Sequence, residues 1–276
     1  MKNKRLKPFD LLLKSLVYLF SVVTVGALFY LVGYILVRGV PYIKPSLFEL
    51  KYTSDNASVV PAIITTIMVV ALALLVALPI GIGSAIYLTE YAGRRNRLVR
   101  IVRLTTETLA GIPSIVYGLF GYLFFLLFLG FGYSILSGAM TLSIMILPLI
   151  MRTTEEAILA VPDGLREGSF ALGAGRLTTI VKIILPSAMP GIFAGIVLAV
   201  GRIVGESAAL IYTAGTVAQI PGSVFASGRT LAIHLFALSS EGLHTNEAFA
   251  TAVVLIVVVA LLNLLSGAIA RKWVRK

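Results

Sequence analysis

The chain has 276 residues, of which 58% are hydrophobic and 13% are charged, and it contains no cysteine. Soluble domains usually carry about 25% charged residues, so this composition excludes an ordinary soluble protein and indicates a membrane protein. The net charge of +11 requires no nucleic-acid partner, because membrane proteins concentrate lysine and arginine on their cytoplasmic side. Without cysteine, disulfide bonds and thiolate chemistry are excluded.

Long apolar segments predict an all-α polytopic fold with six transmembrane helices. Each crossing needs about 20 apolar residues in a helix, because lipid cannot satisfy backbone hydrogen-bonding groups. The predicted spans are 16–37, 60–88, two helices within 108–151, 190–212 and 248–270. The pair within 108–151 should turn near Gly130 and Gly132. Glycine and proline also interrupt the spans at 79–83, 111–114 and 148, either to kink and pack helices or to line a path with unwound backbone.

Basic residues cluster at 2–14, 94–103, 152–182 and 271–276, which places both termini on the cytoplasmic side of a cell (inner) membrane. A cleaved signal peptide is the alternative to a first span, but no clear small-residue cleavage site follows the apolar run. We divide the chain into residues 1–58, with the N-terminal tail, first helix and external loop, and a five-helix core over 59–276.

The one substantial cytoplasmic segment, 152–187, has helical stretches separated by turn signals at 161–164 and 173–175. A short helix with Phe170, Leu172 and Leu177 around a glycine turn can bury an apolar face in a partner's groove. Arg166 and Glu167 would supply charges at the rim of that contact. The alternative is an interfacial helix that lies on lipid headgroups.

Two charges fall inside the fifth predicted span. At 1.5 Å per residue, Arg202 lies about 18 Å along the helix from Pro190, near mid-bilayer, where a charge costs about 3 kcal/mol and suggests a function. The i, i+4 spacing of Arg202 and Glu206 should place both on one helix face, directed into the bundle. A guanidinium suits bidentate oxyanion binding and Ser207 adds a hydroxyl donor. A purely structural ion pair is the alternative.

The sequence shows no phosphate-binding G-x-x-x-x-G-K-[ST] loop, so the chain itself cannot hydrolyse ATP by the usual route. Histidine occurs only at 234 and 244, without helical metal-ligand spacing, and we expect no metal site, no catalytic residue and no enzymatic activity.

The segment 166–186 places five residues at a fixed spacing: Glu167, Gly173, Ile183, Leu185 and Pro186. This spacing resembles the EAA loop of binding-protein-dependent ABC permeases, and the departures are Gly168 and Ser169 in place of alanines. Segments 81–91, 110–120, 153–162 and 201–208 further resemble the phosphate-specific permeases of this class. The continuation over 207–214 is more similar to the A-type than to the C-type permease, although Ala209 stands where proline is more usual.

This resemblance implies a type I (MetI-like) importer permease that forms half of a phosphate path. It implies a homologous C-type permease, two ATPase copies that bind ATP and Mg, and a periplasmic or surface phosphate-binding protein as partners. Residues for ATPase coupling would be Glu167, Ala171, Gly173, Ile183, Leu185 and Pro186; residues of the substrate path would be Arg202, Glu206, Ser207, Pro113 and Ser114. The alternatives are a permease for molybdate, sulfate or phosphonate, the C-type partner, and an ion-coupled transporter or channel.

Overall fold

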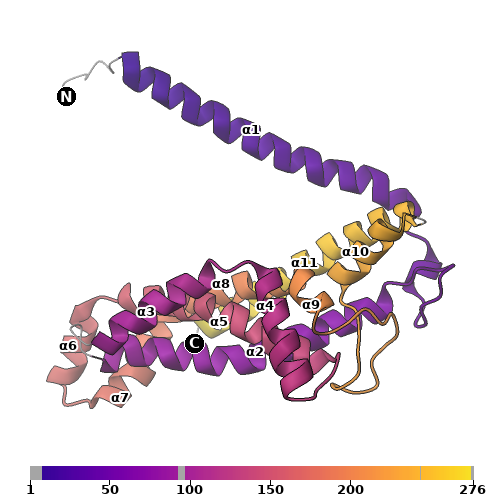
Figure 1. Ribbon diagram of the computed structural model, residues 1–276. Coiled ribbons are helices and arrows are strands. Elements are labelled where there is room, and N and C mark those ends of the chain that lie inside the picture. The colour runs from indigo at the N-terminus through magenta and orange to yellow at the C-terminus, as the bar shows by residue number, and fades with distance from the viewer. Residues whose placement is uncertain (1–7, 93–96, 243, 275–276) are drawn as a thin grey trace.

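A computed structural model describes residues 8–92, 97–242 and 244–274 (Figure 1). Within these ranges the chain forms helices and loops without strands, which confirms the predicted all-α class. The longer helices are α1 (Pro8–Gly39), α2 (Val60–Ile86), α3 (Arg97–Ala110), α5 (Ile135–Leu159), α8 (Leu185–Val204) and α11 (Thr245–Val274). The shorter ones are α4 (Ser114–Gly121), α6 (Asp163–Ala171), α7 (Arg176–Thr179), α9 (Ala208–Ile211) and α10 (Leu231–Glu241).

Wider or tighter helical turns connect several of these helices. The π-helical segments η3 (Tyr87–Tyr91) and η4 (Tyr122–Phe128) continue α2 and α4, and η5 (Ile180–Ile184) joins α7 to α8. The 3-10 helices η1 (Val40–Tyr42) and η2 (Pro45–Phe48) follow α1. Single π-helical turns are rare in proteins and frequently mark functional regions.

Within the described residues, five helices are long and apolar enough to cross a membrane, and the count is six if α3 and the α4–η4 segment form one bent span. The bend between them is 102° and falls at residues 111–113, one of the predicted interruptions. The other two interruptions do not break a helix, because Pro79 and Pro148 lie inside the continuous helices α2 and α5. The segment expected as one helix between 108 and 130 is instead the second part of a bent pair, and the predicted six spans are found when that pair is counted as one span.

The predicted turn between the two helices of 108–151 is confirmed. Gly130 and Gly132 adopt positive φ values of 71° and 62°, which glycine tolerates without strain. Ser134 then caps α5, since its hydroxyl accepts a hydrogen bond from the amide of Ser137 at 3.1 Å.

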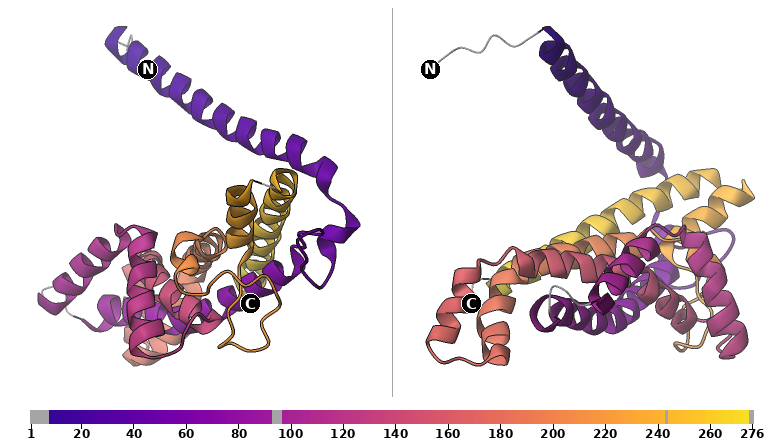
Figure 2. Two further views of the ribbon diagram at one scale, coloured as in Figure 1. Left: turned by 45° about the vertical axis from the view of Figure 1, so that its right-hand side comes forward. Right: turned by 60° about the vertical axis from the view of Figure 1, so that its left-hand side comes forward.

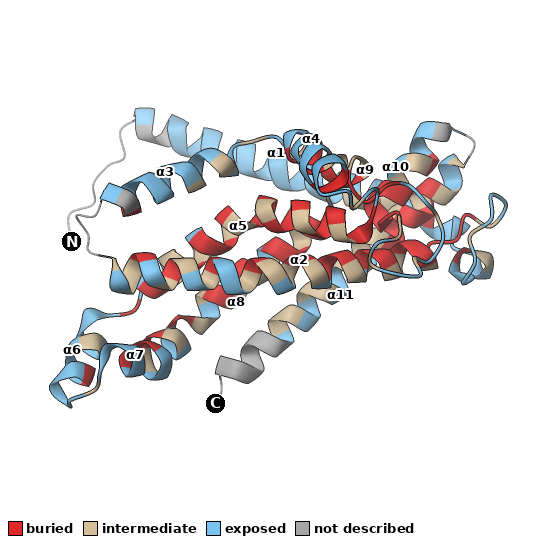
Figure 3. Cartoon of the chain, turned by 60° about the horizontal axis from the view of Figure 1, so that its bottom comes forward, coloured by how far each residue is buried: buried red, intermediate tan, exposed pale blue. Residues whose placement is uncertain are grey.

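The core surrounds α5, which packs against α2 on one side and α8 on another (Figure 3). Leu142, Ile146 and Ile150 of α5 are fully buried among apolar side chains of these helices. Small residues bring the backbones close: a Cβ at Gly195 of α8 would lie 2.1 Å from Oγ1 of Thr153 in α5. The small residue at 195 thus allows close contact between α5 and α8.

Helix α1 leaves this core and extends away from it (Figures 1 and 2). It contacts α11 near its end, where Tyr34 lies edge-on to Phe249 at 5.8 Å between ring centroids. Large apolar side chains along the rest of the helix are exposed, including Phe20 and Phe29. Such a surface requires lipid or another protein subunit as its environment.

A buried polar layer lies where the loop before α2 meets the start of α10. The guanidinium of Arg229 is 4.5 Å from the ring centroid of Tyr52, and that ring contacts His234 edge-on. His234 is 1% exposed, and its Nε2 lies 3.2 Å from the carbonyl oxygen of Ala57. Burial, and secondarily the charge of Arg229, lower the pKa of His234 to about 4. The imidazole is therefore neutral at pH 7.

Lowering the pH from 7 to 5 is expected to destabilise the folded protein by about 2 kcal/mol through His234. The unfolded chain, with a histidine pKa of about 6.5, binds this proton more readily, so stability is lost as the pH falls from about 6.5 towards 4. Calorimetric unfolding in detergent at both pH values measures the effect. His234→Gln should remove this part of the pH dependence and His244→Gln should retain it; an unchanged dependence in His234→Gln would contradict the assignment.

Candidate functional site

Helix α8 ends earlier than the sequence predicted, and the break separates the two charges of the fifth span. The helix stops at Val204, Gly205 follows, and α9 begins at Ala208. Arg202 and Glu206 therefore do not share a helix face, and the predicted i, i+4 pair is wrong. Instead, Oε1 of Glu206 accepts a hydrogen bond from the amide of Ala209 at 3.1 Å, which satisfies a free donor at the start of α9.

Arg202 lies in the last turn of α8, and its side chain is exposed on the isolated chain. The unpaired carbonyl groups at a helix C-terminus carry partial negative charge and stabilise a cation there. The side chain lines a cleft of about 380 Å³ between α3 and α5. The last turn of α8 thus carries a guanidinium at the wall of a cavity.

The cleft follows the C-terminal part of α5. Met145 and Leu159 both line it, so it extends about 21 Å at 1.5 Å per residue. Ala110, the last residue of α3 before the bend, lies at the wall together with Arg202, while Leu88 and Leu159 line it where α2 and α5 end. One end of the cleft therefore meets the bend and the other meets the segment that precedes α6.

The other arginines that line this cleft form ion pairs with glutamates. Arg103 of α3 pairs with Glu155 of α5, and Nε of Arg152 lies 2.9 Å from Oε1 of Glu156. Arg202 forms no ion pair within the described part of the chain. Among the arginines at the wall, Arg202 is the one whose donors remain available to an anion.

The other predicted path residues lie close to the bend but do not line the cleft. Pro113 precedes α4 in extended conformation and Ser114 is its first, half-buried residue. Helix α4 packs on α9, where a Cβ at Gly118 would lie 2.9 Å from Cα of Ala209. The two broken spans are therefore in contact, with Glu206 and the half-buried Ser207 immediately before α9.

Replacing Gly118 by alanine is expected to destabilise the protein by about 1–3 kcal/mol, because the added methyl group overlaps the backbone of α9. Thermal unfolding in detergent measures this effect. Gly83→Ala in α2 is the matched control, since a Cβ there meets nothing within 4 Å and alanine favours helix. Equal stability of the two variants would show that the α4–α9 contact is loose.

The loop after α6 has a defined C-terminal turn. Gly173 has a φ of +82°. Its amide donates a hydrogen bond to the carbonyl oxygen of Phe170 at 2.9 Å, and the amide of Ala174 donates one to the carbonyl oxygen of Ser169 at 3.1 Å. This pair of bonds with a left-handed glycine is a Schellman motif. The hydroxyls of Ser169 and Thr179 are 2.8 Å apart, so the serine that departs from the motif's alanine fastens α6 to α7.

The predicted coupling residues fall into an exposed and a packed set. Glu167, Ala171, Gly173 and Pro186 are exposed, whereas Ile183 and Leu185 are half-buried against apolar residues at the ends of α5 and α8. Beside the exposed set, Leu172 is 90% and Leu177 is 66% exposed. Helices α6 and α7 project from one end of the bundle (Figures 1 and 2). Their exposed apolar side chains are available to a partner.

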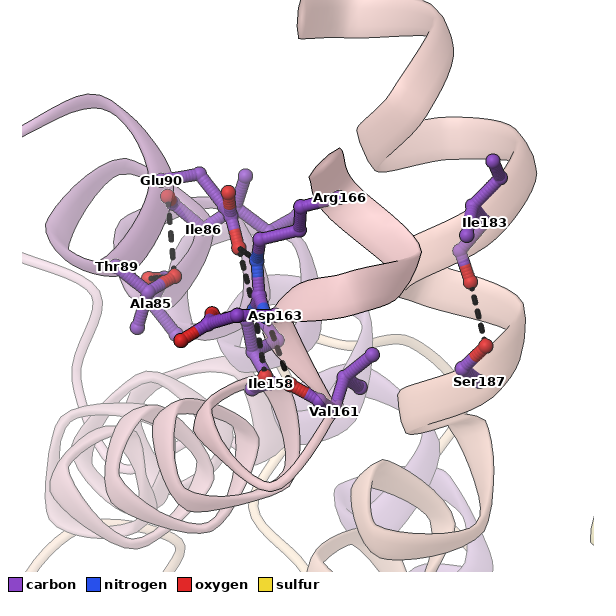
Figure 4. Close-up of polar contacts among 10 residues, drawn as sticks. All are labelled: Ala85, Ile86, Thr89, Glu90, Ile158, Val161, Asp163, Arg166, Ile183 and Ser187. Atoms are coloured by element: carbon purple, nitrogen blue, oxygen red, sulfur yellow. Dashed lines mark hydrogen bonds and ion pairs between the residues drawn. The ribbon is translucent and has the colours of Figure 1, made fainter. Parts of the chain in front are cut away.

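Arg166 does not lie at the rim of this surface, contrary to the sequence prediction. Its side chain is 16% exposed and points inward, where it pairs with Glu90 and Asp163, both at 3.0 Å (Figure 4). It also donates hydrogen bonds to the carbonyl groups of Val161 at 2.7 Å and Ile158 at 2.9 Å.

Sequence reasoning missed two features of the site: the cleft wall on α3 and the partner of Arg166. Arg103 and Glu107 have i, i+4 spacing on an amphipathic segment, which was a usable signal for a helix with a polar face. Glu90 precedes Arg166 by 76 residues, so no local pattern connects them.

Comparison with known proteins identifies the class of protein to which the chain belongs. Residues 77–276 match the family "Binding-protein-dependent transport system inner membrane component", and the chain belongs to this family. It is a multi-pass membrane permease subunit and not an enzyme. Solved structures share its fold. An inward-facing MetNI methionine ABC transporter matches with a TM-score of 0.60 and 21% sequence identity, and the match covers 88% of this chain and 97% of that chain. A bacterial alginate ABC transporter has a TM-score of 0.71, 16% identity and coverage of 97% and 96%.

Curated relatives are more similar in sequence. The chain is 34% identical over 252 residues to "Probable ABC transporter permease protein YqgI" of Bacillus subtilis, covering 85% of both. It is 37% identical over 211 residues to "Phosphate transport system permease protein PstA 1" of Mycobacterium tuberculosis, covering 75% of this chain and 68% of the relative. A third relative, "Phosphate transport system permease protein PstA" of Haemophilus influenzae, is 32% identical over 210 residues, with coverage of 75% and 74%.

Proposed function

We propose that this chain is the A-type permease subunit of an ATP-driven phosphate importer and forms half of its translocation path. The observation that carries the proposal is the guanidinium of Arg202, which has no carboxylate partner in the described residues and lines the cleft at the end of a broken helix. The similarity to phosphate transport permeases at 32–37% identity supports phosphate as the anion.

The chemistry of the cleft suits an oxyanion that moves along it. A guanidinium presents parallel N–H donors that match two oxygens of a phosphate. Arg103 and Arg152 are neutralised by their glutamate partners, so they hold an anion less strongly than Arg202 does. A phosphate bound at Arg202 would therefore be released past weaker sites towards the end of the cleft near Leu159.

Exposed surfaces of the chain suggest where partner subunits would bind. The apolar surface of α6 and α7, with Glu167 beside it, would dock on an ATPase subunit that binds ATP and Mg. The exposed sides of α1 and α3 would meet lipid or a homologous C-type permease. A periplasmic or surface phosphate-binding protein would deliver the anion from the opposite side, and both termini would be cytoplasmic.

Arg202→Gln should lower phosphate uptake by about 100-fold, because glutamine removes the charge and the fork that bind the anion. Radiolabelled phosphate uptake into proteoliposomes with the assembled complex measures it. Arg152→Gln is the matched control in the same cleft, since its charge is already paired at the exposed surface, and it should change uptake less than threefold or so.

Competition with unlabelled molybdate, sulfate and phosphonate tests the choice of anion in the same assay. Stronger inhibition by one of these than by phosphate would reassign the substrate. Normal uptake by Arg202→Gln in an intact complex would remove Arg202 from the path.

Gly173→Val is expected to weaken docking of the ATPase about tenfold, because a β-branched residue is strained by more than 1 kcal/mol or so at positive φ and the Schellman turn must change. Co-purification and stimulated ATP hydrolysis measure docking. Gly175→Ala is the matched control: Gly175 has a φ of −72° and free space around its Cα. Unchanged docking in Gly173→Val would show that the shape of this turn is not recognised.

A further inference from the structure

Arg166 joins three helical elements that are distant in sequence or separated by a turn (Figure 4). Its Nη2 and Nε lie 3.0 Å and 3.2 Å from Oε1 of Glu90, in the π-helical segment η3 that continues α2. Its Nη1 and Nη2 donate to the carbonyl groups of Val161 and Ile158, at the end of α5. Asp163, in the first turn of α6, accepts from Nη1 at 3.0 Å.

These contacts bridge a short connection that otherwise separates α6 from the membrane helices. Only residues 160–162 connect α5 to α6, and α6 packs chiefly against α7 and η5. A side chain of α6 that bonds back to Ile158 and Val161 spans this connection, and its contact with Glu90 adds a second attachment, to α2. A displacement of α6 cannot then be absorbed by bending at 160–162 without breaking several charged hydrogen bonds.

The attachment points adjoin the cleft. Leu88 lies two residues before Glu90 and lines the cleft, and so does Leu159, which follows Ile158. Both ionised groups are largely shielded from water, with exposures of 16% for Arg166 and 12% for Glu90, so the contact is weakly screened by salt. The geometry places a rigid polar contact between the exposed surface of α6 and one end of the cavity.

We propose that Arg166 is a positioning residue, clamped by Glu90, that transmits displacement of α6 to the ends of α2 and α5 and so opens or closes this end of the cleft. The proposal rests on the proposed function, because it assumes that an ATPase displaces α6. It differs from docking, since Arg166 and Glu90 face inward and leave the exposed surface of α6 unchanged.

The test compares Glu90→Gln with Glu247→Gln in the assembled complex. Glu247 also has a basic partner, His244 at 3.9 Å, but it lies at the start of α11 and does not line the cleft. Two quantities are measured: ATP hydrolysed per complex, and phosphate transported per ATP. Glu90→Gln should co-purify normally with the ATPase and lower phosphate transported per ATP about tenfold, because the neutral amide loses the charge-assisted bonds. Glu247→Gln should change neither quantity.

Arg166→Lys supplies a second variant that keeps the charge but cannot reach its four partner residues at once, and it should resemble Glu90→Gln. A purely structural role would lower the amount of complex recovered while phosphate per ATP in the remaining complex stayed normal, and that result would overturn the proposal. Where Glu90→Gln does not assemble, Glu90→Asp replaces it, and a normal ratio there would likewise refute transmission. Absence of ATPase co-purification or phosphate uptake in the unmodified protein would instead refute the proposed function.

Discussion

The breaks in two membrane helices require that the freed backbone groups find partners inside the protein, because lipid offers none. At the first break, between α3 and α4, the hydroxyl of Tyr117 donates to the carbonyl of Leu109 at 2.8 Å, near the end of α3. At the second, between α8 and α9, the carboxylate of Glu206 accepts from the amide of Ala209. The helices that follow the two breaks pack on each other through Gly118, so each break supports the other.

This arrangement determines what Arg202 can do. In an unbroken helix, Glu206 would lie one turn beyond Arg202 and neutralise it. With the break, Glu206 is committed to the start of α9, while Arg202 stays at the wall of the cleft. The same glycine-containing segment therefore releases the cation from its nearest carboxylate and supplies the irregular backbone beside the cavity.

The sequence was sufficient for features set by composition or by local turn chemistry. Apolar runs predicted the spans, Gly130 and Gly132 predicted the turn before α5, and Gly173 predicted the turn after α6. It was insufficient where several local conformations have similar energy: proline at 79 and 148 leaves a helix continuous, while the segment at 111–113 bends the chain by 102°. Neighbouring helices decide between these outcomes, and a single sequence does not show them.

Side-chain roles that depend on distant partners were also out of reach. Arg166 and Glu167 are adjacent and both charged, so local reasoning assigned them the same surface role. The fold separates them, because Glu90 at the end of α2 and the carbonyl groups at the end of α5 together form an acceptor site for one guanidinium. The role of Glu167 remains a prediction.

Two physical routes connect the exposed surface of α6 and α7 with the cleft, and they reach different ends of it. One passes through Arg166 to Leu88 and Leu159. The other passes through η5, against which α6 packs, and along α8 to Arg202 in its last turn. Because η5 continues directly into α8, residues 180–204 form one helical rod of about 37 Å at 1.5 Å per residue. A single movement of α6 would therefore act on Arg202 and on the end of the cleft at Leu88 and Leu159 together, as the proposed coupling of transport to a separate ATPase requires.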